Sequence, residues 1–156
     1  MYQTKLGHVH LKVRNLQRSI EFYTRLLPLR VTETVQDRFA FLSSGPLHHE
    51  LALQALGDDA PLASHYSTGL FHVAFEVPDK SSFAQAYVTL REANIQVYLV
   101  DYGISWAMYF ADPDQNGLEI YVDTRNEPDG RPLWKGESRP LDPQTVLSAL
   151  KSDTPE

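Results

Sequence analysis

The chain has 156 residues, of which 42% are hydrophobic and 22% charged, a composition that suits a globular protein with a core of its own. Its formal net charge is −6 and its Lys and Arg are scattered, so we expect no nucleic-acid partner, because phosphate binding needs clustered positive charge. No apolar run approaches the roughly 18 residues that span a bilayer, and the opening Met-Tyr-Gln-Thr-Lys lacks the apolar core of a signal peptide. We therefore expect a cytoplasmic protein with a small-molecule partner and no membrane contact. The absence of cysteine means that any metal would be bound by His, Asp or Glu.

The first half of the chain predicts a strand, a helix and three further strands. Apolar Val9, Leu11 and Val13 alternate with polar residues, as in a strand with one buried face. A helix is predicted to begin after Asn15, a favourable N-cap, and to end at Pro28. Strand-like segments follow at 29–34, 38–43 and 49–55.

The second half repeats this order. The spacing that separates His8 from His72 also separates Tyr23 from Tyr87, and strand alternation recurs after His72. A second helix is predicted from Asp79 or Ser81 to about Asn94. Strands are predicted at 96–100, 106–111 and 118–123, with a Pro- and Gly-containing turn over 112–117.

The sequence therefore predicts an α+β fold in which two βαβββ modules form a curved mixed sheet around a metal cup. We expect one domain over residues 1–125, with modules at about 5–56 and 69–123. Residues 126–156 are rich in Pro, Gly and charge and are predicted to be a tail with a short helix near 143–150 and an irregular end after Lys151. Such a tail would lie on the surface or take part in contacts of a homodimer or higher homo-oligomer.

Three polar side chains fall on the strand faces that oppose the helices. Parity places His8 and His72 on that face of the first strand of each module, and Glu119 on that face of the last strand. A lone histidine on a strand is usually a surface residue, but two at matched repeat positions favour a common role. Glu119 lies in the apolar run Leu-Glu-Ile-Tyr-Val, where an unpaired carboxylate would cost several kcal/mol. Two His and one carboxylate leave open positions that suit iron(II) with a substrate and dioxygen, while Mn, Zn or Ni are alternatives.

Other residues near these strands leave the chemistry open. Glu50 is interpreted as the repeat counterpart of Glu119 and hence as a possible fourth ligand, which would favour a Lewis-acid metal. Alternatively His49, beside it, is an acid or base, since a neutral imidazole near pH 7 suits that role. His10 is predicted to line the site. His65 lies in a Gly/Ser/Thr-flanked loop and is given no role.

These motifs resemble the vicinal-oxygen-chelate superfamily of glyoxalases, bleomycin-resistance proteins and extradiol dioxygenases. The resemblance covers about residues 5–125 and rests on Gly-His-Val-His-Leu-Lys-Val, Ser-Ile-Glu-Phe-Tyr, Gly-Leu-Phe-His-Val-Ala-Phe and Asp-Pro-Asp-Gln-Asn-Gly-Leu-Glu-Ile-Tyr. The His48-His49-Glu50 segment and the ending from Tyr109 are most similar to catechol-type extradiol dioxygenases. This resemblance implies that His8, His72 and Glu119 bind iron(II), that His49 is the acid or base, and that Tyr109 donates a hydrogen bond to a substrate oxygen.

The sequence departs from that family in two places, with Tyr102 where relatives tend to carry a histidine and Trp106 where they often carry Glu. Both residues, with His10, are expected to shape the substrate site. The resemblance favours a metal-dependent, iron(II) extradiol oxidoreductase of aromatic compound catabolism, acting on a vicinal-diol aromatic substrate and dioxygen. A glyoxalase-type isomerase or lyase with Glu50 as fourth ligand, and a metal-free binding or resistance protein, are the alternatives.

Overall fold

The computed structural model describes residues 1–64 and 66–151. It divides into two compact units, which are described separately. Unit 1 comprises Met1–Gly69 with Asp112–Asn116, and unit 2 comprises Leu70–Ala111 with Gly117–Glu156, apart from residues 65 and 152–156. No helix in the described residues is long and apolar enough to cross a membrane.

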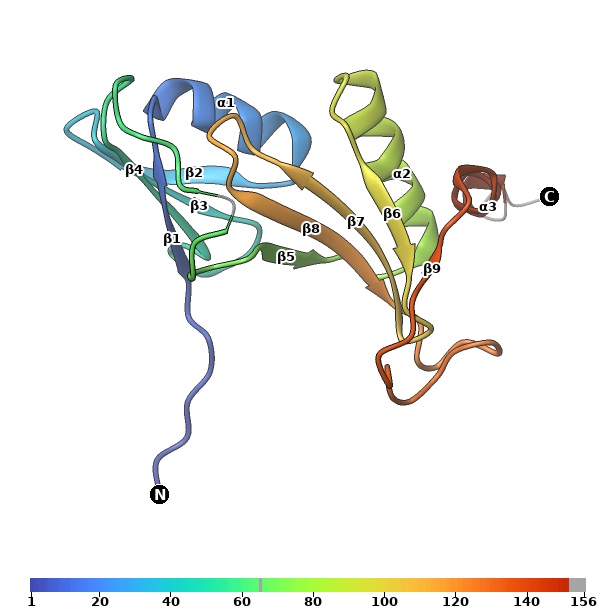
Figure 1. Cartoon of the computed structure of the whole chain (residues 1–156). Coiled ribbons are helices and arrows are strands. Elements are labelled where there is room, and N and C mark those ends of the chain that lie inside the picture. The colour runs from blue at the N-terminus through green and yellow to red at the C-terminus, as the bar shows by residue number, and fades with distance from the viewer. Residues whose placement is uncertain (65, 152–156) are drawn as a thin grey trace. The chain divides into compact units, whose positions relative to one another are not determined.

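Unit 1 is a four-stranded mixed sheet with one helix (Figure 1). Its elements are β1 (Val9–Val13), α1 (Leu16–Leu26), β2 (Arg30–Val35), β3 (Phe39–Ser43) and β4 (Leu51–Ala55). The strand order is β1-β4-β3-β2, with β1 and β4 parallel and the other pairs antiparallel. Helix α1 packs on β2, β3 and β4, and Tyr23 and Leu26 of the helix are buried, as are Leu42, Leu51 and Leu53 of the strands.

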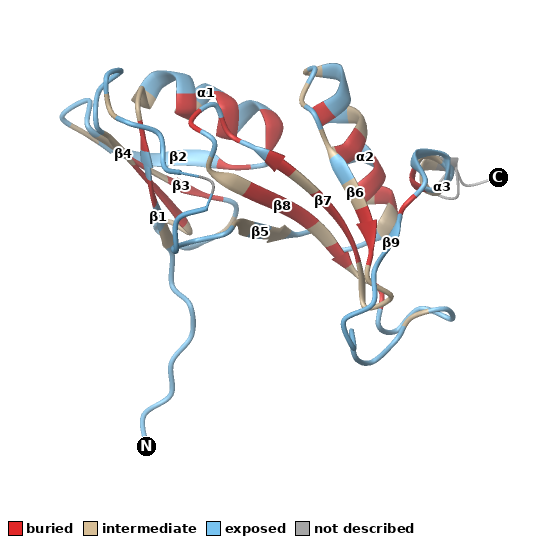
Figure 2. Ribbon diagram, in the orientation of Figure 1, coloured by how far each residue is buried: buried red, intermediate tan, exposed pale blue. Residues whose placement is uncertain are grey.

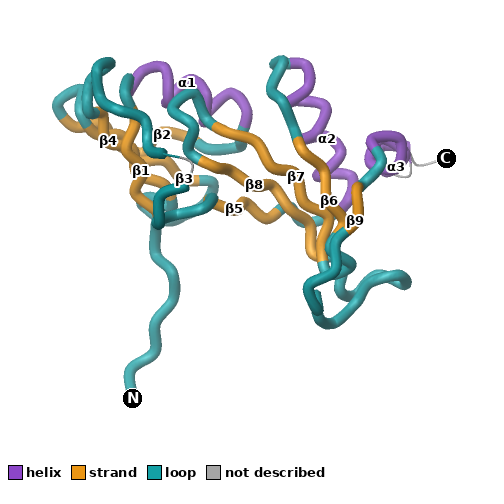
Figure 3. Tube along the Cα trace, in the orientation of Figure 1, coloured by secondary structure: helices purple, strands orange, loops and turns teal. Residues whose placement is uncertain are grey.

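Unit 2 repeats this arrangement and adds a fifth strand. Its elements are β5 (Val73–Glu76), α2 (Lys80–Glu92), β6 (Tyr98–Asp101), β7 (Ser105–Ala111), β8 (Gly117–Asp123), β9 (Arg139–Pro140), α3 (Pro143–Ser148) and a 3-10 helix (Ala149–Lys151). The order is β5-β8-β7-β6-β9, again with the first pair parallel. Buried residues follow β7, β8 and one side of α2 (Figure 2), and the segment between β8 and β9 is a loop (Figure 3).

The predicted α+β class and the twofold βαβββ order are confirmed. Both helices begin where their caps predict, since the side chain of Asn15 accepts a hydrogen bond from Arg18 N at 3.0 Å and that of Asp79 accepts one from Ser82 N at 2.7 Å. The short tail helix is confirmed as α3.

One boundary prediction is wrong, and one strand was not predicted. His49 and Glu50 precede β4, whose paired residues begin with Leu51 opposite Val9 and Leu42, although the Glu50 backbone already donates to the Leu42 carbonyl at 3.0 Å and accepts from Val9 N at 2.9 Å. Strand β9 was not predicted, since two residues carry no periodicity and Pro140 is a poor strand former that sits here on a sheet edge. His65 and the predicted irregular end after Lys151 lie outside the described residues.

The predicted turn between the last two strands is confirmed and belongs to unit 1. Asp112 Oδ1 accepts hydrogen bonds from the backbone N–H groups of Asp114 at 2.9 Å and Asn116 at 2.8 Å, so its side chain fixes the turn. The buried carboxylate of Asp114 in turn forms an ion pair with Arg18 of α1 and accepts a hydrogen bond from Arg14 N. Asp112 and Asp114 therefore act as structural residues of the turn.

Candidate active site

Glu119 lies at the centre of the polar face of the unit 2 sheet. Leu118 and Ile120 on either side of it are buried on the opposite face, and the register places Ala74 of β5 and Tyr109 of β7 directly beside it. The predicted alternation along β8 is therefore confirmed. Glu119 is only 8% exposed, which makes its carboxylate a buried charge that needs a partner.

His72 supplies one such partner from the residue before β5. Its Nε2 lies 2.7 Å from Oε2 of Glu119. This approach depends on Gly117, because a Cβ there would come within 2.3 Å of the Phe71 carbonyl oxygen and would displace the chain that carries His72. The other ring nitrogen of His72, Nδ1, is buried and has no hydrogen-bond partner in the described part of the chain. Among the described residues the polar contact of this ring is therefore with Glu119, while the rings of Phe71 and Tyr109 each lie 5.4 Å from it.

Tyr109 contacts the second oxygen of the same carboxylate. Its hydroxyl lies 3.2 Å from Glu119 Oε1 and 3.1 Å from the hydroxyl of Tyr102. Burial, the hydrogen bond with Tyr102 and the charge of Glu119 all hold the pKa of the Tyr109 hydroxyl well above its ordinary value. The phenol therefore keeps its proton. The phenol has one proton, which it can donate to Glu119 Oε1 or to the Tyr102 hydroxyl.

The remaining histidines gather in unit 1. The rings of His8 and His49 lie 4.5 Å apart, and Nδ1 of His49 lies 2.8 Å from Nδ1 of His48. Nε2 of His48 lies 3.1 Å from Glu33 of β2. Desolvation, followed by the neighbouring imidazoles of His8, His48 and His10, lowers the pKa of His49. A lowered pKa keeps the imidazole neutral near pH 7, the state in which it can accept a proton.

Glu50 is oriented toward its own loop. Its Oε2 accepts hydrogen bonds from Ser44 N at 2.7 Å, Ser44 Oγ at 2.9 Å and Ser43 Oγ at 3.2 Å. The hydrogen bond from the Ser44 backbone is the main cause of the lowered pKa of this carboxyl. A carboxylate oxygen with three donors is satisfied without a metal.

The strand register also corrects the repeat assignment of Glu50. Val9 pairs with Leu51 as Val73 pairs with Leu118, so the counterpart of Glu119 is Ala52. The prediction that Glu50 is that counterpart is wrong by two residues. The first module therefore carries no carboxylate at the position where the second module carries Glu119.

Trp106 does not lie with the other candidates. It is 8% exposed, packs edge-on against Phe83 of α2 with ring centroids 6.1 Å apart, and has the ammonium of Lys80 at 4.5 Å from its ring. Tyr109, three residues further along β7, points to the opposite face. The prediction that Trp106 shapes the substrate site is therefore wrong, since strand parity places it in the core under α2. His10 is exposed on β1 with its ring 6.1 Å from that of Phe39.

The chemistry of the His72–Glu119 pair fits a divalent first-row metal. Two ligand atoms about 2.1 Å from one ion and at right angles to each other lie about 3 Å apart, close to the 2.7 Å between His72 Nε2 and Glu119 Oε2. In the described residues no group of three or more His, Asp or Glu side chains is gathered closely enough to hold a metal. The structure thus brings together two of the three predicted ligands in unit 2, while His8 lies in unit 1.

Sequence reasoning did not single out Glu33, His48 as a partner of His49, or Trp134. Trp134 lies in the loop before β9, with its ring 5.7 Å from that of Tyr102. The only sequence signal was compositional, since Trp134 is one of two tryptophans in the chain and stands in a segment otherwise rich in charge, Gly and Pro.

Residues 5–120 match the Glyoxalase/Bleomycin resistance protein/Dioxygenase superfamily, and the chain belongs to this superfamily. It is 33% identical over 120 residues to a catechol-2,3-dioxygenase of Bacillus subtilis (strain 168), covering 77% of this chain and 42% of that one. It is 26% identical over 162 residues to biphenyl-2,3-diol 1,2-dioxygenase 3 of Rhodococcus globerulus, covering 97% of this chain and 85% of that one.

A solved glyoxalase/bleomycin resistance protein/dioxygenase domain from Frankia sp. EAN1pec has the same fold, with a TM-score of 0.66 at 22% identity over 78% of this chain and 99% of that one. The chain spans less than half of the Bacillus relative. The predicted resemblance is confirmed at the level of the superfamily and of its dioxygenase-named members.

Proposed function

We propose that the protein is an iron(II)-dependent extradiol-type dioxygenase that cleaves an aromatic vicinal diol next to its hydroxylated carbons. The observation that carries the proposal is the arrangement around Glu119, whose two oxygens face an imidazole at 2.7 Å and a phenol at 3.2 Å. His72 and Glu119, with His8, would bind the metal. The dioxygenase names of the two relatives support this reaction class.

When bound, iron(II) would supply open coordination positions for the diol and for dioxygen and would allow electrons to pass from the diol, which is oxidised, to dioxygen, which is reduced. The residues of the chain would donate and accept protons. Tyr109, whose pKa is raised, keeps its proton and donates a hydrogen bond to a substrate oxygen at this site. His49, neutral near pH 7, accepts a proton from a substrate hydroxyl and later returns it. Overall, one C–C bond of the ring breaks and both oxygen atoms enter the product, so no other reductant is required.

The state of Glu50 favours this reaction over the isomerase alternative. A glyoxalase-type site with Glu50 as fourth ligand would require its carboxylate to leave three hydrogen bonds from Ser43 and Ser44. In the second module Glu119 pairs with Tyr109, and at the equivalent place in the first module Ala52 pairs with Phe41. Ala52 has no ligand atom. Three ligands leave the open positions that an oxygenase needs.

The test is the metal content of anaerobically purified protein, followed by addition of catechol under air with the yellow ring-fission product monitored. We expect iron near one per chain and yellow product. Glu119→Gln should lose both. Glu76→Gln is the matched control, because Glu76 is on the polar face of the same sheet, where it accepts a hydrogen bond from Tyr121, and it should retain the iron.

Other outcomes separate the alternatives. Nickel or zinc at one per chain, with metal lost in Glu50→Gln and no yellow product, would favour the isomerase. Absence of bound metal in the wild-type protein after incubation with iron(II) would contradict both metal-dependent functions and favour a binding protein.

A further inference from the structure

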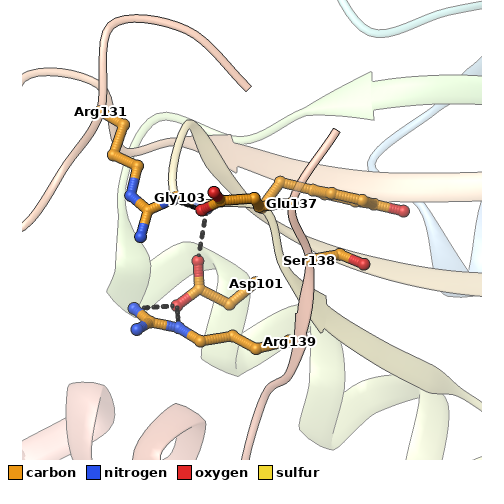
Figure 4. Close-up of a pocket in the computed structure, with 7 residues that line it drawn as sticks. Asp101, Gly103, Arg131, Glu137, Ser138 and Arg139 are labelled. Atoms are coloured by element: carbon orange, nitrogen blue, oxygen red, sulfur yellow. Dashed lines mark hydrogen bonds and ion pairs between the residues drawn. The ribbon is translucent and has the colours of Figure 1, made fainter. Parts of the chain in front are cut away.

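The loop and strand that follow β8 are attached to the end of β6 at two points. Strand β9 pairs with β6, and Arg139 donates from Nε and Nη2 to Oδ2 of Asp101 at 2.9 and 2.8 Å. Asp101 is buried, so this ion pair is shielded from water on the carboxylate side. Figure 4 shows Arg139 reaching Asp101 from the tail, with Arg131 and Glu137 beside Gly103. We call residues 131–139 the strap.

The second attachment depends on Gly103. Arg131 N donates to the Gly103 carbonyl at 2.8 Å, and the Arg131 guanidinium forms an ion pair with Glu137. Gly103 has a φ of +74°, and a Cβ there would lie 2.9 Å from Cδ of Arg131. Because Gly103, next to Tyr102, has no side chain, the strap can approach it closely.

These attachments hold Trp134 against Tyr102. The Trp134 Nε1–H donates to the Glu137 carbonyl at 2.6 Å, which fixes the indole on the strap. Its ring meets that of Tyr102 edge to face, at 90° and 5.7 Å between centroids, a favourable aromatic geometry. Trp134 is nevertheless 47% exposed, so half of a large apolar ring remains open to a ligand.

The small pocket beneath the strap is not where a ring would bind. Its volume is about 90 Å³, and its charged lining residues, Asp101 with Arg139 and Glu137 with Arg131, already neutralise each other. A cavity that holds benzene measures about 150 Å³. An aromatic ligand near Tyr102 would therefore contact the outer, exposed side of Trp134.

We propose that Trp134 is a specificity residue of the substrate site, which contacts the ring of an aromatic substrate and positions Tyr102. This inference rests on the proposed function. Tyr102 links Trp134 to Tyr109 and Glu119 through hydroxyl groups 3.1 Å apart and a hydrogen bond of 3.2 Å. Tyr102 thus lies between Trp134, which packs on its ring, and Tyr109, whose hydroxyl its own hydroxyl meets, so an aromatic substrate whose oxygen meets Tyr109 would lie beside the Tyr102–Trp134 ring pair.

The test compares Trp134→Ala, Trp134→Phe and Leu133→Ala in the iron-loaded full chain with catechol as substrate. Leu133 is the matched control, since it is the neighbouring apolar residue of the strap and is 64% exposed. We expect Trp134→Ala to raise KM about ten-fold while kcat changes less than about three-fold, because an aromatic contact is lost but no proton donor is. Trp134→Phe should restore most of the loss, and Leu133→Ala should match wild type.

A second measurement does not depend on turnover. Catechol should quench part of the tryptophan fluorescence of wild-type protein, and Trp134→Phe should abolish that part, while cyclohexane-1,2-diol should quench neither. Turnover of catechol with equal KM in Trp134→Ala and Leu133→Ala would overturn the inference and leave the dioxygenase proposal intact. Quenching through Trp134 without turnover would refute the dioxygenase and support an aromatic-ligand site at the strap.

Discussion

Tyr23→Phe tests how the Asp112 turn is held in unit 1. Tyr23 is fully buried on α1, and its hydroxyl donates to Asp112 Oδ2 at 3.0 Å. Burial, and then the charge of Asp112, raises the pKa of this phenol far above its ordinary value. The substitution removes one donor to a buried carboxylate and leaves the ring in place.

The expected loss of folding stability depends on the hydrogen bonds that Asp112 keeps in the variant. A hydrogen bond to a charged group contributes about 1.5–3 kcal/mol. Asp112 keeps three other donors, including the Asn116 amide at 2.8 Å from the same oxygen, so its charge is not left unpaired. We therefore expect the lower part of the range, about 1.5–2 kcal/mol, which lowers the melting temperature of a chain of this size by about 3–8 °C.

The assay is thermal unfolding followed by circular dichroism, with Tyr87→Phe as the matched control. Tyr87 occupies the same position of the repeat on α2 and is 8% exposed, but among the described residues its hydroxyl has no hydrogen bond. Tyr87→Phe should change the midpoint by less than about 2 °C, as expected for a change of less than about 0.5 kcal/mol. Equal shifts in the two variants would refute the role of the Tyr23–Asp112 bond.

Three further outcomes are expected. The raised pKa of Tyr23 means that the folded state retains a proton that the unfolded state releases above about pH 10. The stability contributed by this group is therefore full below that pH and falls as pH rises beyond it. Denaturant titrations should show that the free energy of unfolding falls less at alkaline pH in Tyr23→Phe than in wild type. Tyr109→Phe should lower kcat on catechol about 100-fold, as for other lost transition-state donors, while elemental analysis finds iron unchanged. Gly103→Ala should raise the KM for catechol and should destabilise the chain more than Gly136→Ala does. Gly136 is the control because it has a similar φ of +77° but a Cβ there would have no neighbouring atom within 4 Å. Kinetics and calorimetry on the two variants therefore isolate the effect of the contact with Arg131.

Much of the fold follows from local signals that act over one or two turns of chain. Asn15 and Asp79 fix helix starts through their own side chains, and strand alternation fixes which face of β8 carries Glu119. These signals depend on neighbouring residues only, so the sequence reveals them. The His72–Glu119 approach could also be anticipated from parity on adjacent strands.

The parts that the sequence did not predict depend on register and on distant contacts. Ala52 is identified as the counterpart of Glu119 only by strand pairing, because the spacing between equivalent residues changes along the chain, from 64 for Val9 and Val73 to 68 for Phe41 and Tyr109 and 67 for Ala52 and Glu119. Trp106 and Tyr109 are three residues apart on β7, so strand alternation places their side chains on opposite faces of the sheet and gives them different roles. The approach of Trp134 to Tyr102 depends on the strap, whose hydrogen bonds have no periodic pattern.

The register also shows how the two modules have come to differ. At equivalent places the first module pairs Phe41 with Ala52 and the second pairs Tyr109 with Glu119. The phenol and the carboxylate therefore occur only in unit 2, where strand β9 and the strap cover the adjoining edge. Unit 1 instead carries the imidazole cluster of His8, His48 and His49. The residues proposed to bind the metal and to transfer protons are therefore divided between the modules, with the phenol and the carboxylate in unit 2 and the imidazole cluster in unit 1.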